Sequence, residues 1–181
     1  MKNLHSALAS EFELSLDAGV IDRAEIIRWA DNIMLTEEYD DNIAEICMSM
    51  HKTDKEIEEF LRRVAGSTTN WEGTRRMLGR MYGALTHEPD RIHEFTKFLD
   101  RLWIRNGHEV PEDLGFIIGL EEDYQLAEEG QWASIDEFRS YLLENLSRYQ
   151  TNNTEQDVPS DGHKPSSRAP SDGSTAPADA H

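Results

Sequence analysis

Residues 53–66 read TDKEIEEFLRRVAG, and this stretch decides the fold class. Its apolar side chains recur at the three- and four-residue spacing that places them on one face of an α-helix: Ile57, Phe60, Leu61 and Val64. Thr53 with Glu56 matches the capping box that begins a helix, and Gly66 suits the left-handed position that ends one. Because periodicity and end signals are independent, together they predict a helix over 54–65.

The same combination of signals continues on both sides of this segment. Asp22 with Glu25 and Ser134 with Glu137 have the spacing of a capping box or its Asp variant. No stretch alternates as a strand does, and the connections are short, which favours antiparallel neighbours. The sequence predicts an all-α fold, a single compact domain of about seven to eight helices packed as antiparallel hairpins. The predicted helices span residues 3–17, 22–36, 40–51, 54–65, 70–87, 89–105, 111–129 and 134–149.

Composition changes sharply near residue 150. Residues 151–181 hold four of the six prolines, no aromatic residue, and Val158 as the one large aliphatic side chain. Such a segment buries too little apolar surface to offset its loss of conformational entropy on folding. We therefore expect an α-helical domain over 1–150 and a disordered Pro/Ser/Asp-rich tail over 151–181.

The chain is strongly acidic, with 36 Asp and Glu against 18 Lys and Arg and a net charge of −18. Residues 1–150 hold 31 of the acidic and 16 of the basic residues, so the acidity belongs to the helical domain. Proteins that bind nucleic acid present a basic face, whereas an acidic surface attracts basic partners. We expect a basic protein partner and no nucleic acid.

Two further properties bear on location. No window offers the roughly 18 uncharged apolar residues that a membrane-spanning helix needs. Near the N-terminus, Glu11, Glu13 and Asp17 interrupt any apolar core of a signal peptide. Cys47 is the only cysteine, so the chain cannot form an internal disulfide, and a reducing compartment fits best. The sequence predicts a cytoplasmic protein without a membrane partner, and it leaves the oligomeric state open.

Two acidic runs are the candidate partner-binding residues. The first lies between two predicted helices: Glu37, Glu38, Tyr39, Asp40 and Asp41. The second lies on the predicted helix 111–129: Glu121, Glu122, Asp123 and Tyr124. In each run carboxylates surround an aromatic ring that would anchor an interface. The alternatives are a solvated loop whose Asp40 or Asp41 caps the next helix, and a solvated acidic helix face.

Motifs for catalysis or cofactor binding are not found in the sequence. It contains no phosphate-binding loop, no dinucleotide fingerprint, no nucleophile elbow and no calcium-loop spacing. Cys47 and His51 lie one turn apart, but no second ligand pair accompanies them, and Cys47 belongs to an apolar stripe, which favours a buried structural cysteine. Asp90 and His93 resemble half of a di-iron motif without its other half, so His93 is expected on the surface. We expect no catalytic residue, no metal and no cofactor.

The predicted helix 70–87 has two notable features. Arg75, Arg76 and Arg80 form the one basic patch, which we expect to pair with carboxylates of the same domain. Gly79 and Gly83 lie one turn apart and would let another helix approach closely.

Two pairs of stretches carry a family resemblance. They are residues 18–21 (AGVI) followed by 25–31 (EIIRWAD), and residues 119–124 (GLEEDY) followed by 126–130 (LAEEG). Together they resemble small acidic helical bacterial immunity proteins, which neutralise a cognate secreted or contact-delivered toxin. The resemblance implies a non-enzymatic protein that occludes the basic active-site cleft of its toxin.

Two other classes of function stay open at this point. One is a helical enzyme, or a small-ligand or metal protein, that uses Asp, Glu and His without a recognisable motif. The other is a regulatory adaptor or homo-oligomer that uses an apolar helix face, which an exposed patch of Leu, Met and Trp would favour.

Overall fold

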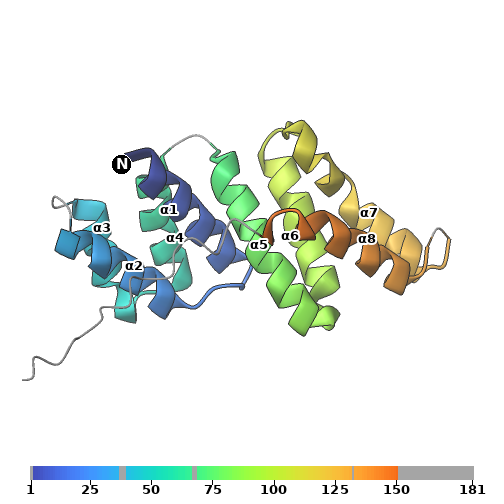
Figure 1. Ribbon diagram of the computed structural model, residues 1–181, viewed down its shortest axis with the longest axis horizontal. Helices are drawn as coiled ribbons and strands as arrows, with labels where there is room; N and C mark the ends of the chain where they lie inside the picture. The colour runs from blue at the N-terminus through green and yellow to red at the C-terminus, as the bar shows by residue number, and fades with distance from the viewer. Residues whose placement is uncertain (1, 37–39, 67–68, 132, 151–181) are drawn as a thin grey trace, which may run out of the picture.

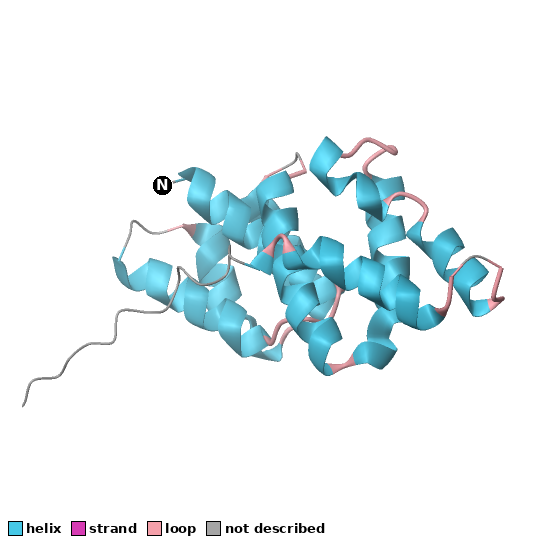
Figure 2. Ribbon diagram, turned by 45° about the vertical axis from the view of Figure 1, so that its right-hand side comes forward, coloured by secondary structure: helices cyan, strands magenta, loops and turns pink. Residues whose placement is uncertain are grey.

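The computed structural model describes residues 2–36, 40–66, 69–131 and 133–150, and within them it is all-α (Figure 1). It contains eight α-helices, three short 3-10 helices and no strand in this described part. Figure 2 shows these helices joined by loops. The predicted tail, residues 151–181, lies outside the described residues. The α-helices are α1 (Lys2–Asp17), α2 (Arg23–Thr36), α3 (Asp41–Cys47), α4 (Asp54–Ala65), α5 (Trp71–His87), α6 (Ile92–Arg105), α7 (Leu120–Glu128) and α8 (Ile135–Ser147). The 3-10 helices are η1 (Ser49–His51), η2 (Pro89–Arg91) and η3 (Glu112–Ile117).

The predicted end signals are present at the ends of the helices. Thr53 accepts from the Glu56 amide while the Glu56 carboxylate accepts from the Thr53 amide at 2.8 Å, so the capping box of α4 is complete. Ser134 forms the same reciprocal pair with Glu137 at the start of α8. Gly66 has a φ of 96° at the end of α4, in the left-handed region that glycine tolerates.

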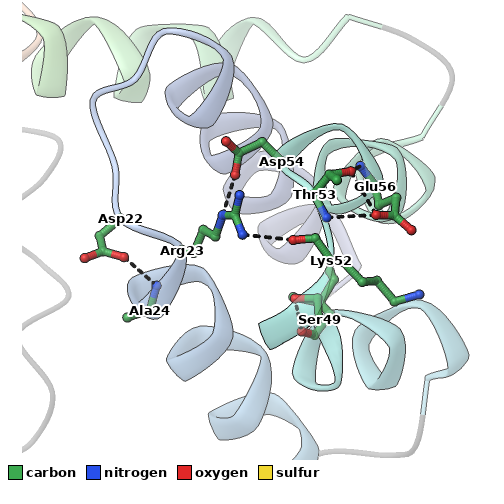
Figure 3. A network of polar contacts seen from close by, with 9 residues as sticks. Asp22, Arg23, Ala24, Ser49, Lys52, Thr53, Asp54 and Glu56 are labelled. Carbon is green, nitrogen blue, oxygen red and sulfur yellow. Dashed lines mark hydrogen bonds and ion pairs between the residues drawn. The ribbon is translucent and has the colours of Figure 1, made fainter.

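Figure 3 shows how the start of α2 is fixed to the start of α4. Asp22 accepts from the Ala24 amide at 2.9 Å, which caps α2. Arg23, the next residue, donates to the Asp54 carboxylate and, through Nη1, to the Lys52 carbonyl oxygen at 2.8 Å. A single arginine therefore joins two helix N-termini that are far apart in the sequence.

Two of the predicted helices are interrupted. The prediction of one helix over 111–129 is wrong, because η3 ends at Ile117 and α7 begins only at Leu120. Gly119 between them has a φ of 72°, a left-handed conformation that breaks the α-helical hydrogen-bond pattern. The prediction over 40–51 is also too long, since α3 ends at Cys47 and the chain continues as the 3-10 helix η1.

Helix α1 is shared between two apolar clusters. It packs against both α4 and α5, and the helices follow one another from α2 and α3 at one end of the molecule to α7 and α8 at the other (Figure 1). Ala9 and Phe12 of α1 belong to the cluster formed with α2, α3 and α4. Leu14 and Ala18, near the end of the same helix, belong to the cluster formed with α5 to α8. A single helix thus contributes to both halves of the core.

The contact between α1 and α5 is unusually close at one glycine. A Cβ at Gly73 would lie 2.7 Å from the Ala7 carbonyl oxygen and 2.8 Å from the Glu11 nitrogen. The close approach predicted at Gly83 is wrong, because a Cβ there would meet nothing within 4 Å. Gly79, the other glycine of that prediction, is buried. The close approach at Gly73, in the first turn of α5, was not predicted.

A buried ion-pair network joins three helices beside this contact. Glu11 of α1 is 2% exposed, and its carboxylate accepts from Arg80 of α5 at 2.6 Å. The same guanidinium donates to Glu25 of α2, also at 2.6 Å. Burial raises the pKa of Glu11, whereas the positive charge of Arg80 acts in the opposite direction. Arg80 is the group that keeps an ionised Glu11 compatible with this burial.

Candidate functional site

The second acidic run occupies the first turn of helix α7. The chain turns into this helix at Gly119, and Glu121, Glu122 and Asp123 follow directly. The amides at a helix N-terminus carry a partial positive charge that stabilises carboxylates nearby. These three residues therefore have a local structural reason to be acidic, and they also place negative charge at one end of the helix.

Helix α6 packs against α7 and adds a fourth carboxylate, Asp100, to this run. Burial raises the pKa of Asp100, the negative charge of Glu121 raises it further, and His108 acts in the opposite direction. Burial likewise raises the pKa of Asp123, with a further contribution from Glu122. In neither carboxyl do the neighbouring charges offset the cost of burying the ionised form. We call Asp100, Glu121, Glu122 and Asp123 the α6–α7 acidic surface.

The arginines of α5, the one basic patch of the sequence, pair with carboxylates of the same domain. The expected internal pairing of the α5 arginines is confirmed: Arg75 with Asp113 at 2.8 Å, Arg76 with Glu72 at 3.3 Å and Arg80 with Glu11 at 2.6 Å. By contrast, no member of the α6–α7 acidic surface forms a salt bridge with another described residue. The negative charge of this surface is thus left without an internal partner.

Tyr124, the aromatic residue of the second run, is buried in the core. It is 7% exposed, its ring stacks on His93 with centroids 4.6 Å apart, and it meets the edge of Phe138 at 5.7 Å. Its hydroxyl donates to Glu128 at 3.3 Å. His93, predicted at the surface, is partly exposed, and one face of its ring is covered by this stack. Tyr124 positions α7 against α6 and α8, and the exposed chemistry of the run is that of its carboxylates.

The first acidic run is described only in part. Glu37, Glu38 and Tyr39 lie outside the described residues. Asp40 caps α3 by accepting from the Asn42 amide at 2.8 Å and the Ile43 amide at 3.2 Å, as the structural alternative predicted. Asp41 occupies the first turn of α3 and is exposed.

The single cysteine is half-buried rather than fully buried. Cys47 packs at the margin of the cluster formed by α1 to α4. Burial and a hydrogen bond with Asp31 raise the pKa of its thiol to about 11, which keeps it protonated and weakly nucleophilic at neutral pH. Among the described residues, no three His, Cys, Asp or Glu side chains gather in a geometry that could hold a metal ion. None of the described helices is both long and apolar enough to cross a membrane.

Grooves in the surface were not predicted from the sequence, and two of them lie beside α1. One, of about 420 Å³, lies where α1, α4 and α6 meet, and its one carboxylate, Glu13, is held by Arg62 at 2.7 Å. The other, of about 680 Å³, lies beside the connection from α1 to α2. Its four carboxylates already have structural partners: Asp22 with the Ala24 amide, Glu25 with Arg80, Asp54 with Arg23, and Glu88 with Arg91. Neither of these two grooves presents an unpaired acid–base pair. A third groove, of about 430 Å³, contains one carboxylate, Glu109, which forms no salt bridge with another described residue.

Comparison with known proteins adds no assignment to this geometry. No protein family, no curated protein and no solved structure matches the chain.

Proposed function

We propose that this chain is a non-enzymatic binding protein that covers a basic surface of a partner protein, in the manner of an immunity protein that occludes its cognate toxin. The single observation that carries the proposal is that the carboxylates of the α6–α7 acidic surface form no salt bridge with another described residue. Asp100 lies on α6 and Glu121 on α7, which pack against each other, and the charge of Glu121 raises the pKa of Asp100. A Lys or Arg side chain of a partner placed between them would remove this repulsion, so complex formation would gain free energy at this point.

The charge of the whole chain supports the same proposal. A net charge of −18 accelerates encounter with a basic partner, because long-range attraction steers the two proteins together. Stoichiometric occlusion needs complementary surfaces and no catalytic groups. The alternative of an enzyme or small-ligand protein stays a prediction, and the two grooves beside α1 give it no unpaired acid–base pair.

The experiment uses the product of the gene adjacent to this one, produced in bacterial cells with and without the chain. If that product arrests growth, the wild-type chain is expected to restore growth and to bind the product in calorimetry. The site variant combines Asp100→Asn, Glu121→Gln, Glu122→Gln and Asp123→Asn. It is expected to bind about tenfold more weakly or worse, with a shallower dependence on salt, because close interfacial charge pairs carry at least about 1.5 kcal/mol each.

A matched control removes the same number of charges elsewhere. It combines substitutions of four exposed carboxylates that form no described salt bridge: Asp90→Asn, Glu109→Gln, Glu112→Gln and Glu144→Gln. This control keeps the net charge of the site variant, so it separates local complementarity from general attraction. Equal binding by the two variants would refute the site, and failure of the wild-type chain to bind or protect would refute the function.

A further inference from the structure

The most exposed large apolar side chains of the described residues gather in one part of the chain. Leu35 is 82% exposed, Met50 is 70% exposed and Met48 is 65% exposed. The next most exposed apolar side chain, Ile104, is at 52%. We call Leu35, Met48 and Met50 the α2–η1 apolar corner.

Packing places these three residues on neighbouring elements. Helix α3 and the 3-10 helix η1 both pack against α2. The Cys47 thiol, at the end of α3, donates a hydrogen bond to the Asp31 carboxylate of α2. Leu35 lies one helical turn beyond Asp31 on the same face of α2. Met48 follows Cys47 directly, and Met50 lies within η1. In Figure 1, α2 and α3 lie at the end of the molecule opposite to α7 and α8.

Exposure of this degree is not required by the fold of α2. The buried face of the helix is formed by Ile26, Ala30 and Ile33, and Leu35 points away from it into solvent. An exposed Leu and two exposed Met on adjoining elements are typical of a surface that another protein covers. Methionine is unbranched and polarisable, so it adapts to the apolar face of a bound segment.

The elements that form the corner carry an excess of negative charge. The described residues between 28 and 52 include four acidic residues, Asp31, Asp40, Asp41 and Glu45, and two basic ones, Arg28 and Lys52. Of the two basic residues, Lys52 already pairs with Glu45 at 3.7 Å. Asp31, Asp40 and Asp41 form no salt bridge with another described residue. The corner therefore combines apolar anchors with a rim of carboxylates that lack cationic partners.

We propose that the α2–η1 apolar corner binds a basic amphipathic helix of a partner protein. Leu35, Met48 and Met50 contact the apolar face of that helix, and Asp40 and Asp41 attract its Lys and Arg side chains. The corner and the α6–α7 acidic surface share no residue and no helix, so this proposal does not depend on the proposed function.

Charge favours a basic amphipathic helix over the other possible occupants of the corner. A second copy of the chain would bring one carboxylate rim against another, and an anionic bilayer would be repelled in the same way. Residues 151–181 have five acidic and two basic residues, with Val158 as their one large aliphatic side chain, so they match neither the apolar anchors nor the rim. A basic amphipathic segment satisfies both features at once.

The test uses the full chain and a synthetic helical peptide of Leu and Lys, about 18 residues or roughly five turns long. A peptide of the same composition, scrambled so that it has no apolar face, is the control. With methionine methyl groups labelled by ¹³C, the designed peptide is expected to shift the signals of Met48 and Met50. Met77 and Met81 are 0% exposed and serve as internal references that should not move.

Variants locate the contact. Leu35→Ser, Met48→Ser and Met50→Ser together are expected to weaken binding of the designed peptide about tenfold or more, because buried apolar anchors dominate such interfaces. The matched control changes three exposed apolar residues elsewhere, Ile104→Ser, Ile118→Ser and Tyr141→Ser, and should bind as the wild type does. Urea unfolding confirms that each variant is folded.

Three results would overturn the proposal. The first is equal affinity for the designed and scrambled peptides, which would indicate attraction by charge alone. The second is equal loss of affinity in both triple variants. The third is concentration-dependent dimerisation of the wild-type chain that the Leu35, Met48 and Met50 variant abolishes, which would assign the corner to a second copy of this chain.

Discussion

The Nε of Arg80 donates to the Glu11 carboxylate at 2.6 Å, and this contact ties the two halves of the core together. Glu11 belongs to α1, the helix that both apolar clusters share. Arg80 also reaches Glu25 at 2.6 Å, so the interaction fixes α2 as well. A polar contact, in addition to apolar packing, therefore sets the relative position of three helices.

Removal of the arginine should destabilise the protein strongly. Arg80→Met leaves the Glu11 carboxylate buried without its cation, and loss of one partner of a buried pair costs about 3–5 kcal/mol. Replacement of both partners, as Glu11→Leu with Arg80→Met, should cost much less, since no charge is then left buried. Urea unfolding monitored by circular dichroism measures both free energies.

The pH dependence of the same variant supplies a control. Burial raises the pKa of Glu11, and without Arg80 that pKa should rise further. The folded state then keeps a proton that the unfolded chain releases, so the stability of Arg80→Met should fall as the pH rises through this range. A loss of stability that is the same at pH 4 and pH 8 would contradict the assignment.

Gly73 and Gly83 form a matched pair within helix α5. Gly73→Ala places a Cβ 2.7 Å from the Ala7 carbonyl oxygen, so α1 and α5 must move apart at a cost of about 1–3 kcal/mol. Gly83→Ala meets nothing within 4 Å and should stabilise the helix by about 0.5–1 kcal/mol. The midpoints of thermal unfolding of the two variants are expected to shift in opposite directions. Equal shifts would show that helix propensity alone determines the change in stability.

Features that depend on neighbouring residues could be predicted from the sequence. The capping box of Thr53 and Glu56 and the apolar stripe that contains Ile57 and Leu61 are both local, and the structure has the helix where they place it. The break before α7 also had a local signal, because Gly119 lies within an otherwise helical pattern. The helix-favouring residues on either side outweighed that glycine in the prediction.

Features that depend on the packing of distant segments could not be predicted. Nothing in the sequence relates Asp100 to Glu121, since the packing of α6 on α7 brings them together. The burial of Tyr124 has the same origin, because the turn at Gly119 sets which face of α7 meets His93. A run of charges in a sequence identifies acidic residues, and only the fold decides which of them lack a partner.

Asp100→Asn should change how stability depends on pH. The pKa of Asp100 is raised by burial and by Glu121, so the folded state holds its proton at a pH where the unfolded chain has lost it. Stability of the wild type therefore falls as the pH rises through the range above the ordinary Asp value of about 3.9. The variant lacks this fall and should gain a few tenths of a kcal/mol relative to the wild type between about pH 4 and pH 7.

The titration of the Asp100 carboxyl can be followed directly by ¹³C spectroscopy. Glu121→Gln should lower the pKa of Asp100, because it removes the repulsive charge but keeps the size of the side chain. Asp90→Asn removes one exposed charge elsewhere and controls for the change in net charge. An Asp100 pKa that is unchanged in Glu121→Gln would mean that the two carboxylates do not interact.

Cys47 should react slowly with alkylating agents despite being half-buried rather than fully buried. Burial and Asp31 raise the pKa of its thiol to about 11, so the reactive thiolate is scarce at neutral pH. The alkylation rate of the folded chain should rise about tenfold per pH unit well beyond the ordinary thiol pKa of about 8.5. Asp31→Asn removes the neighbouring carboxylate and should increase the rate at pH 8, whereas a wild-type rate that levels off near pH 8.5 would rule out the contact between Asp31 and Cys47 that places α3 against α2.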